Sequence, residues 1–303
     1  MEGELSSVRA MMTAKKKRRF RLPRVGRANR SLAGNIWMLL FLVFMAAFMV
    51  FPLVYSVSNA FKPLSELLVF PPQFFVRNPT LQNFIDLSNL MANAWVPFSR
   101  YIFNTVFVTV VGTVGQIVIA AHAAYALANN KFAGAKWIFK IIVLSLMFSP
   151  AVTAVPNYLI MARLGWIDTY ASVIVPVFCS SLGLYFFKQF MEGIPVSLLE
   201  SARMDGANEV VVLWKIVMPV VKPAWLTLII LSIQNLWNVN SGYIFSENLK
   251  SLSASLNQIV AGGIGRAGTA GAASVIMMTV PVAAFVMTQS NVIETMSTSG
   301  MKD

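Results

Sequence analysis

Amide and aromatic side chains gather in one short part of an otherwise apolar stretch. Asparagine and glutamine amides donate and accept hydrogen bonds, so they can bind hydroxyl groups, and flat aromatic rings can pack on the apolar faces of sugar rings. Such polar groups are costly in a membrane-crossing segment unless they face protein or water. The cluster therefore indicates contacts with a sugar-like ligand, or else hydrogen bonds that join helices to one another. Its members are Gln234, Asn235, Trp237, Asn238, Asn240 and Tyr243.

A second group of residues predicts two short polar helices joined by a sharp turn. Ser197 and Glu200 have the spacing of a capping box, in which each side chain binds the other residue's backbone amide. Asp205 and Gly206 then predict a break, because glycine adopts left-handed backbone conformations without steric cost. Pro219 is expected to end the second helix. Such a surface suits docking of a partner protein, although an amphipathic helix lying on a membrane would show the same pattern.

Few side chains here could perform covalent chemistry. The chain has one histidine and one cysteine, His122 and Cys179, which leaves no intramolecular disulfide and argues against most histidine-based catalysis. It lacks a phosphate-binding G-x-x-x-x-G-K-[ST] loop. Residues 263–268 satisfy G-x-G-x-x-G, but we expect no strand before them and find no acidic residue about 20 positions later, so we predict a loop. The sequence thus predicts a non-enzymatic chain without a metal or cofactor of its own.

The composition is typical of a membrane protein. Hydrophobic residues make up 57% of the 303 residues and charged residues 12%, with a mean hydropathy of +0.67. A soluble domain has about 25% charged residues. The apolar residues form runs of about 20, the length that a helix needs to cross a bilayer. We predict an all-α membrane protein with six transmembrane helices: Ile36–Val57, Ile102–Leu127, Ile138–Ile160, Ala171–Phe187, Trp225–Phe245 and Ala270–Gln289.

The distribution of charge predicts the orientation of these spans. The net charge is +12, and most lysines and arginines lie in segments that share one side with the N-terminus. The positive-inside rule then places both termini in the cytoplasm. The basic run Lys15–Arg19 is expected to contact anionic lipid headgroups. It has no interleaved aromatic residues to stack on bases, so we predict no nucleic-acid binding. The first apolar run is too long for a signal peptide and is expected to remain in the protein.

The polar segment also carries a family resemblance. Residues 200–207, Glu-Ser-Ala-Arg-Met-Asp-Gly-Ala, with Ile216 and Pro219, closely resemble the EAA loop of ABC importer permeases. The match departs conservatively from the family pattern at Ser201, Leu213 and Met218. The proline-rich and aromatic residues between 51 and 84 look like the opening of carbohydrate-uptake permeases, similar to the second permease of the maltose transporter, and residues 299–303 resemble their short tail.

This resemblance implies a type I ABC importer permease with a cytoplasmic EAA coupling helix. Two separate ATPase subunits would bind ATP and Mg²⁺, and a second permease subunit would complete a heterodimer. An extracytoplasmic sugar-binding protein would deliver an oligosaccharide, and the bacterial cytoplasmic (inner) membrane is the expected location. The implied ATPase-coupling residues are Glu200, Ala202, Asp205, Gly206, Ala207, Leu213, Ile216, Pro219, Gly300 and Lys302. The expected substrate pathway contains Asn235, Trp237, Asn238, Asn240 and Tyr243.

We expect a basic cytoplasmic N-terminal segment at 1–31, a permease domain at 32–290 and a cytoplasmic tail at 291–303. Within the permease domain, residues 58–100 would form an outer loop with a short helix after Thr80, and residues 191–223 a coupling loop. Pro150 and Pro156 predict a kink in the third span.

Three alternatives remain at this point. One is a permease for another solute such as glycerol phosphate or a polyamine; the expected spans contain no cationic cavity for an anion, which favours a neutral sugar. The second is an ion-coupled secondary transporter, which would need a carboxylate within the membrane, and the expected spans have none. The third is a membrane scaffold that only binds a cytoplasmic partner.

Overall fold

The computed structural model describes residues 32–92, 95–129, 132–240 and 242–299. These residues form helices joined by turns, and no strand occurs among them. Four helices are long and apolar enough to cross a membrane, and the number rises to six if each of two sharply bent helix pairs is one span. This agrees with the predicted all-α architecture. Segment 1–31 and the tail residues Gly300 and Lys302 lie outside the described residues, and so do the predictions made for them.

The chain divides into two compact units, residues 1–53 and 54–303, and helix α2 (Leu32–Phe61) contributes to both. Nearly every described side chain of its first part is exposed, as suits a helix surface that meets lipid. The helix extends beyond the predicted end of this span at Val57, since it continues through Pro52 to Phe61. Prolines are tolerated inside membrane helices, where neighbouring groups satisfy the freed backbone.

Polar contacts fix the loop that follows α2. Lys62 is only 2% exposed, and its ammonium donates to Asn59 Oδ1 at 2.9 Å and to the carbonyl of Gln73. Asn83 donates to the carbonyl oxygens of Ala60 and Lys62. The loop contains the short helices α3 (Leu64–Leu67) and α4 (Gln82–Ala92). The helix predicted to follow Thr80 is therefore confirmed.

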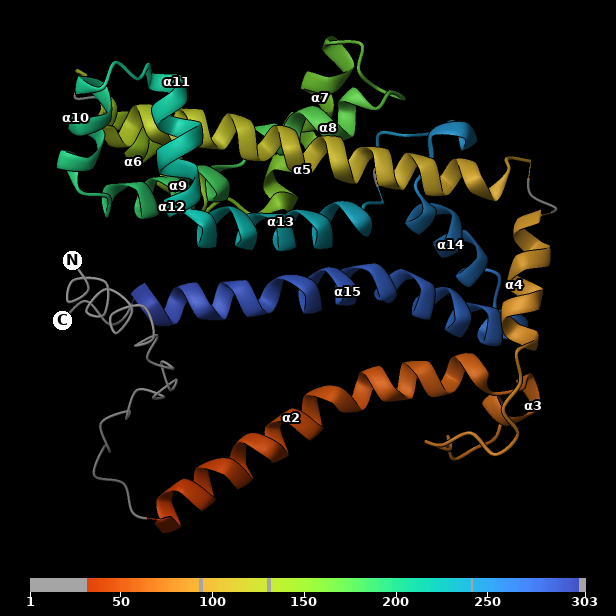
Figure 1. The fold of residues 1–303 in the computed structure, drawn as a ribbon. Coiled ribbons are helices and arrows are strands. Elements are labelled where there is room, and N and C mark those ends of the chain that lie inside the picture. The colour runs from red at the N-terminus through yellow and green to blue at the C-terminus, as the bar shows by residue number, and fades with distance from the viewer. Residues whose placement is uncertain (1–31, 93–94, 130–131, 241, 300–303) are drawn as a thin grey trace, which may run out of the picture. The chain divides into compact units, whose positions relative to one another are not determined.

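Helix α5 (Phe98–Asn129) is the central element of the second unit. It packs against α8 (Ala171–Phe178), α9 (Ser181–Glu192) and α13 (Lys222–Trp237), as Figure 1 shows. Small residues permit this close approach. A Cβ atom at Gly115 would lie 2.1 Å from Phe178 Cε1, a distance that no real contact allows.

Breaks interrupt the third and fourth predicted spans. Helices α6 (Ala135–Ser145) and α7 (Pro150–Arg163) meet at 110°, which confirms a bend at Pro150 but makes it far sharper than a kink. Ser149 caps α7 and Pro150 occupies its first position, where a missing N–H costs nothing. Helices α8 and α9 together form a third candidate span, and exposed Cys179 lies at the break between them.

The fifth predicted span is shorter than expected. Helix α13 ends at Trp237, so the prediction that the span reaches Phe245 is wrong. The chain instead leaves the helix and forms a short 3-10 turn and a helix that was not predicted. Residues 263–268 lie at a 3-10 turn, with no strand before it among the described residues. The remaining elements are η2 (Glu247–Leu249), α14 (Leu252–Val260), η3 (Ile264–Arg266) and α15 (Ala267–Ser299).

Candidate functional site

The coupling loop contains two helical arms joined by a turn at Gly206. Helix α10 (Val196–Met204) ends where Gly206 takes φ = +84°, a left-handed conformation that side chains with a Cβ rarely adopt. The Ala207 amide donates to the Ala202 carbonyl and the Gly206 amide to the Arg203 carbonyl, both at 3.0 Å. These two bonds form a Schellman motif, which satisfies the last carbonyls of the helix. The predicted break at Asp205-Gly206 is confirmed.

The predicted capping box at the start of α10 is wrong. Pro195 occupies the N-cap position and makes no side-chain bond there, so the helix begins at Val196 and Ser197 already lies within its first turn. From this position the Ser197 side chain does not cap the helix. The backbone carbonyl of Ser197 instead accepts a hydrogen bond from Ser201 Oγ at 2.8 Å.

The second arm differs from an ordinary helix. It consists of α11 (Glu209–Val211), the π-helical segment η1 (Val212–Val217) and α12 (Met218–Val220), and it meets α13 at 81°. Pro219 lies inside α12, so the helix ends just after it rather than at it. π-helical segments are rare and often lie at functional sites.

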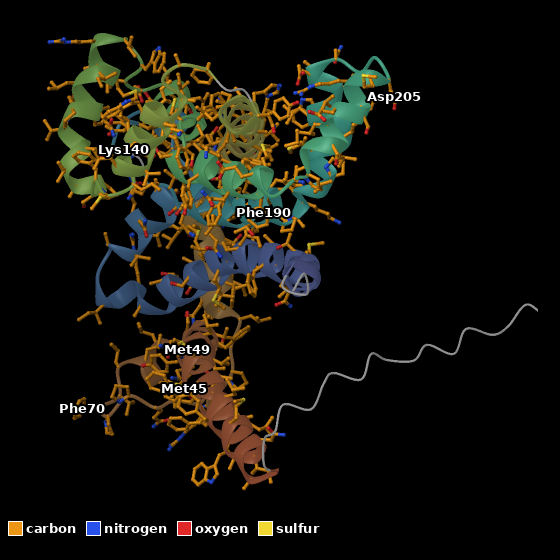
Figure 2. All side chains as sticks on the ribbon, turned by 90° about the vertical axis from the view of Figure 1, so that its left-hand side faces the viewer. Met45, Met49, Phe70, Lys140, Phe190 and Asp205 are labelled. Carbon is orange, nitrogen blue, oxygen red and sulfur yellow. The ribbon has the colours of Figure 1, made fainter. Side chains whose placement is uncertain are left out.

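Burial separates the predicted coupling residues into two groups. Ala202 and Leu213 are 8% and 1% exposed and belong to the hydrophobic core that includes α5 and α9, while Ala207 and Ile216 pack partly against it. These four positions hold the two arms in place. The other described members of the set are exposed: Glu200, Asp205, Gly206 and Pro219. Figure 2 shows Asp205 at the peripheral tip of the two arms.

An ion pair closes the turn between the arms. Arg203 of α10 donates from Nε to Glu209 Oε1 at 2.8 Å and from Nη2 to Glu209 Oε2 at 3.2 Å. The hydroxyl of Tyr125 on α5 donates to the same carboxylate. Sequence reasoning assigned no role to these residues. The available signal was the pair of opposite charges on the two sides of the Gly206 turn.

The amide and aromatic cluster around α13 does not form one site. Trp237 is buried, and its indole Nε1 donates to the Met277 carbonyl of α15 at 3.0 Å. Asn238 donates to the Gln234 carbonyl one turn earlier at 3.0 Å. Asn235 lines a separate cavity beside Gln116 and Ser232. At Trp237 the geometry therefore matches the second interpretation of the cluster, in which its hydrogen bonds join helices to one another.

The other two members of the cluster line an open cavity of about 620 Å³, here called the tyrosine cavity. Asn240 and Tyr243 meet Asn157 and Tyr158 of α7 there, and the two tyrosine rings lie 6.2 Å apart between centroids at 37°. Among the described residues, no charged side chain contributes to its lining. Sequence reasoning missed Tyr158, although the neighbouring Pro156 marked a distorted span.

A single acidic residue fixes one wall of this region. The Asp168 carboxylate accepts hydrogen bonds from the amides of Phe245 and Ser246, at 2.9 and 2.8 Å, and from the Ser246 hydroxyl. These bonds lower the pKa of Asp168 below its usual value, with the Ser246 side chain the largest cause. The Asp168 amide also donates to the Tyr243 carbonyl at 2.8 Å. The contacts join the α7–α8 turn to the segment that carries Tyr243.

Comparisons with known proteins agree with this architecture. The profile of the family described as "Binding-protein-dependent transport system inner membrane component" matches residues 116–293. The arabinooligosaccharides transport system permease protein AraQ of Halalkalibacterium halodurans is 30% identical over 201 residues, which cover 64% of this chain and 69% of that protein. AraQ of Bacillus subtilis is 30% identical over 204 residues, covering 67% and 72%.

A solved structure resembles this fold over most of the chain. It is a bacterial ABC transporter involved in the import of the acidic polysaccharide alginate, and it superposes with a TM-score of 0.73 at 22% identity over 86% of this chain and 98% of that one. This likeness supports the helical arrangement described above. The chain belongs to the family of inner-membrane components of binding-protein-dependent transport systems.

Proposed function

We propose that this chain is a permease subunit of an ABC importer that moves a neutral sugar or oligosaccharide across the bacterial cytoplasmic membrane. One observation carries this proposal, namely the α10–Gly206–α11 turn, whose sequence closely resembles an EAA loop and whose tip is exposed. Membership in the binding-protein-dependent transport family supports the importer class. The arabinooligosaccharide relatives support a carbohydrate substrate.

The exposed tip of the coupling loop would dock into an ATPase subunit. Glu200, Asp205 and Gly206 would contact the partner, and the neighbouring Met204, which is 89% exposed, offers an apolar anchor. Ala202, Ala207, Leu213 and Ile216 would act indirectly, because their packing fixes the direction of the arms. Pro219 would set the bend towards α13, and Gly300 and Lys302 would add a tail contact.

The ATPase subunits would bind ATP and Mg²⁺ and hydrolyse the nucleotide, while this chain performs no covalent step. Two coupling loops are needed for two ATPase subunits, so a second permease subunit, most simply a different chain, would pair with this one. The basic residues of the sequence favour an orientation with both termini, and hence the coupling loop, in the cytoplasm.

The tyrosine cavity is the proposed contribution of this chain to the sugar pathway. Tyr158 and Tyr243 offer aromatic surfaces for a pyranose or furanose ring, and the Asn157 and Asn240 amides can bind hydroxyl groups. The uncharged lining favours neutral sugars over uronates or phosphorylated solutes. Trp237 would support the pathway by joining α13 to α15, and Asn238 by its bond within the end of α13. Asn235 would act from the separate cavity beside Gln116 and Ser232.

The proposal is tested by purifying the tagged chain together with the proteins that its cells co-express. The expected result is a complex with an ATPase and a second permease. In proteoliposomes with a sugar-binding protein outside, this complex should take up labelled arabino-oligosaccharides or maltodextrins only when ATP is enclosed. A non-hydrolysable ATP analogue is the matched control. Uptake by the lone chain, driven by an ion gradient without ATP, would contradict the proposal.

A further inference from the structure

Two similar polar clusters hold the opposite ends of α5. In each cluster a buried tyrosine of α5 donates its hydroxyl to a glutamate, and a basic residue pairs with the same glutamate. From this arrangement we propose that α5 is the element that couples the ATPase-facing loop to the segment at the other face of the membrane. The inference rests on the proposed function for what docks at each end, but the linkage itself lies within this chain.

The first cluster ties α5 to the coupling loop. Tyr125 is 6% exposed and donates to Glu209, which also binds Arg203 through two hydrogen bonds. Asn208 caps the helix that Glu209 begins, so the carboxylate is held on an ordered backbone. A displacement of α10 or α11 would therefore act on the end of α5 through this carboxylate as well as through Leu199 in the core.

The second cluster ties α5 to the segment that follows α13. Tyr101 is 3% exposed and donates to Glu247 Oε2 at 3.3 Å, and Glu247 pairs with Lys250. The Lys250 hydrogen bond lowers the pKa of Glu247 below its usual value, which keeps the carboxylate charged.

Two further side chains of α5 hold the same segment. Asn104 donates to the carbonyls of Asn248 and Lys250, at 2.8 and 2.9 Å, and accepts from the Tyr170 hydroxyl at 2.6 Å. Thr105 Oγ1 accepts from the Leu252 amide at 2.7 Å. The segment from 247 to 252 is thus attached to α5 over more than one turn.

The spacing of the two clusters fits the thickness of a membrane. Tyr101 and Tyr125 lie about 36 Å apart along α5 at ~1.5 Å per residue, slightly more than the ~30 Å of the hydrocarbon core. Figure 1 shows α5 as one continuous helix with α11 beside one end and α14 near the other. A single helix held by charged clusters at both membrane faces can pass a displacement from one face to the other as a rigid body.

The same conservative change can be made at both ends. Tyr125→Phe and Tyr101→Phe each remove one hydroxyl and keep the buried ring. Tyr185→Phe on α9 is the matched control, because the Tyr185 ring stacks on Phe139 and no hydroxyl partner is found for it among the described residues. Glu209→Gln and Glu247→Gln repeat the test from the other side of each contact.

The first readout is hydrogen–deuterium exchange in the assembled complex, measured by mass spectrometry. Coupling through α5 predicts that Tyr125→Phe speeds exchange at residues 247–252 and that Tyr101→Phe speeds exchange at residues 203–211. The control should change neither region. Changes confined to the mutated end would overturn the inference, and this result does not depend on any transport activity.

The second readout is the stimulation of ATP hydrolysis by sugar-loaded binding protein in proteoliposomes. We expect each tyrosine variant to lower the stimulation about five-fold or more, the lower end of typical allosteric coupling. The double variant should be no worse than either single one, since both interrupt the same linkage. If the losses of stimulation in the two single variants multiply in the double variant, the two contacts act independently, and the inference is overturned. A wild-type complex that no binding protein stimulates would instead count against the proposed function.

Discussion

Substitutions at Gly206 can separate the shape of the coupling turn from the surface that it presents. Gly206 has φ = +84°, and a Cβ added there would meet no atom of the described residues within 4 Å, its two chain neighbours aside. An alanine therefore adds no clash, and its cost is the left-handed backbone alone, about 1–2 kcal/mol. That cost corresponds to a factor of about 5–30 in the population of the native turn. Asparagine tolerates this conformation better than alanine does, so Gly206→Asn should cost less.

Gly206→Asp has nearly the same shape as Gly206→Asn but adds a negative charge directly after exposed Asp205. If this surface docks an ATPase, the aspartate variant should lose co-purifying ATPase and ATP-driven uptake, whereas the asparagine variant keeps most of both. Gly165→Asp is the matched control, because Gly165 has φ = +69° and equally open space in the α7–α8 turn. Equal loss in the asparagine and aspartate variants would refute the role of charge at the docking surface. Full activity of Gly206→Ala would refute the need for a left-handed turn.

Four further substitutions, one of them with a matched glycine control, test the cavity, the loop contact and the packing. Tyr158→Ala and Tyr243→Ala should each raise the KM of sugar uptake at least several-fold while ATPase binding is unchanged; an unaltered KM in both would remove the tyrosine cavity from the pathway. Because hydrogen bonds lower the pKa of Asp168, its contribution to stability is present above its ordinary value of 3.8 and is lost as pH falls through the lowered pKa. The difference in thermal unfolding between wild type and Asp168→Asn should therefore shrink below pH 3.8, and a constant difference would contradict this account. Gly271→Ala places a Cβ 3.1 Å from the backbone of α2, so it should cost about 1–3 kcal/mol in unfolding experiments, whereas Gly265→Ala, with open space, should cost little.

Hydropathy predicted the helical architecture well but located its breaks poorly. Pro52 and Pro150 have the same effect on backbone hydrogen bonding, yet α2 continues through the first and a new helix begins at the second. The difference lies in the neighbouring residue, because Ser149 accepts a bond from the Ala151 amide and so caps the new helix. Apolar Ile244 and Phe245 extended the predicted fifth span beyond Trp237, although those residues lie in a segment held by Asp168.

The missed helix α14 did have a sequence signal. Leu252, Leu256 and Ile259 recur at helical spacing and are all buried, and Ser251 accepts a bond from the Ala254 amide as its cap. The position of α10 had a competing signal, since Pro195, the observed N-cap, lies two residues before Ser197, the N-cap that the capping box suggested.

The candidate sites differed in how far the sequence could define them. The Gly206 turn is local, so residue types and spacing were sufficient to predict it. The tyrosine cavity joins Tyr158 to Tyr243, which are distant in sequence, and their proximity depends on the 110° bend and on the end of α13. Neither the bend angle nor the end of the helix follows from composition, so the sequence alone predicts one site around Trp237, whereas the side chains of the cluster contact different neighbours.

The break between α8 and α9 makes the native chain convenient for spectroscopy. Its one cysteine, Cys179, is exposed at that break, so a maleimide fluorophore or spin label would attach at a single position without a cysteine-free background. Pro176 and Val177 of the same helix line the tyrosine cavity. A label on Cys179 would therefore sit close enough to report occupancy of the tyrosine cavity as a change in emission or mobility, and its attachment would require no substitution in this chain.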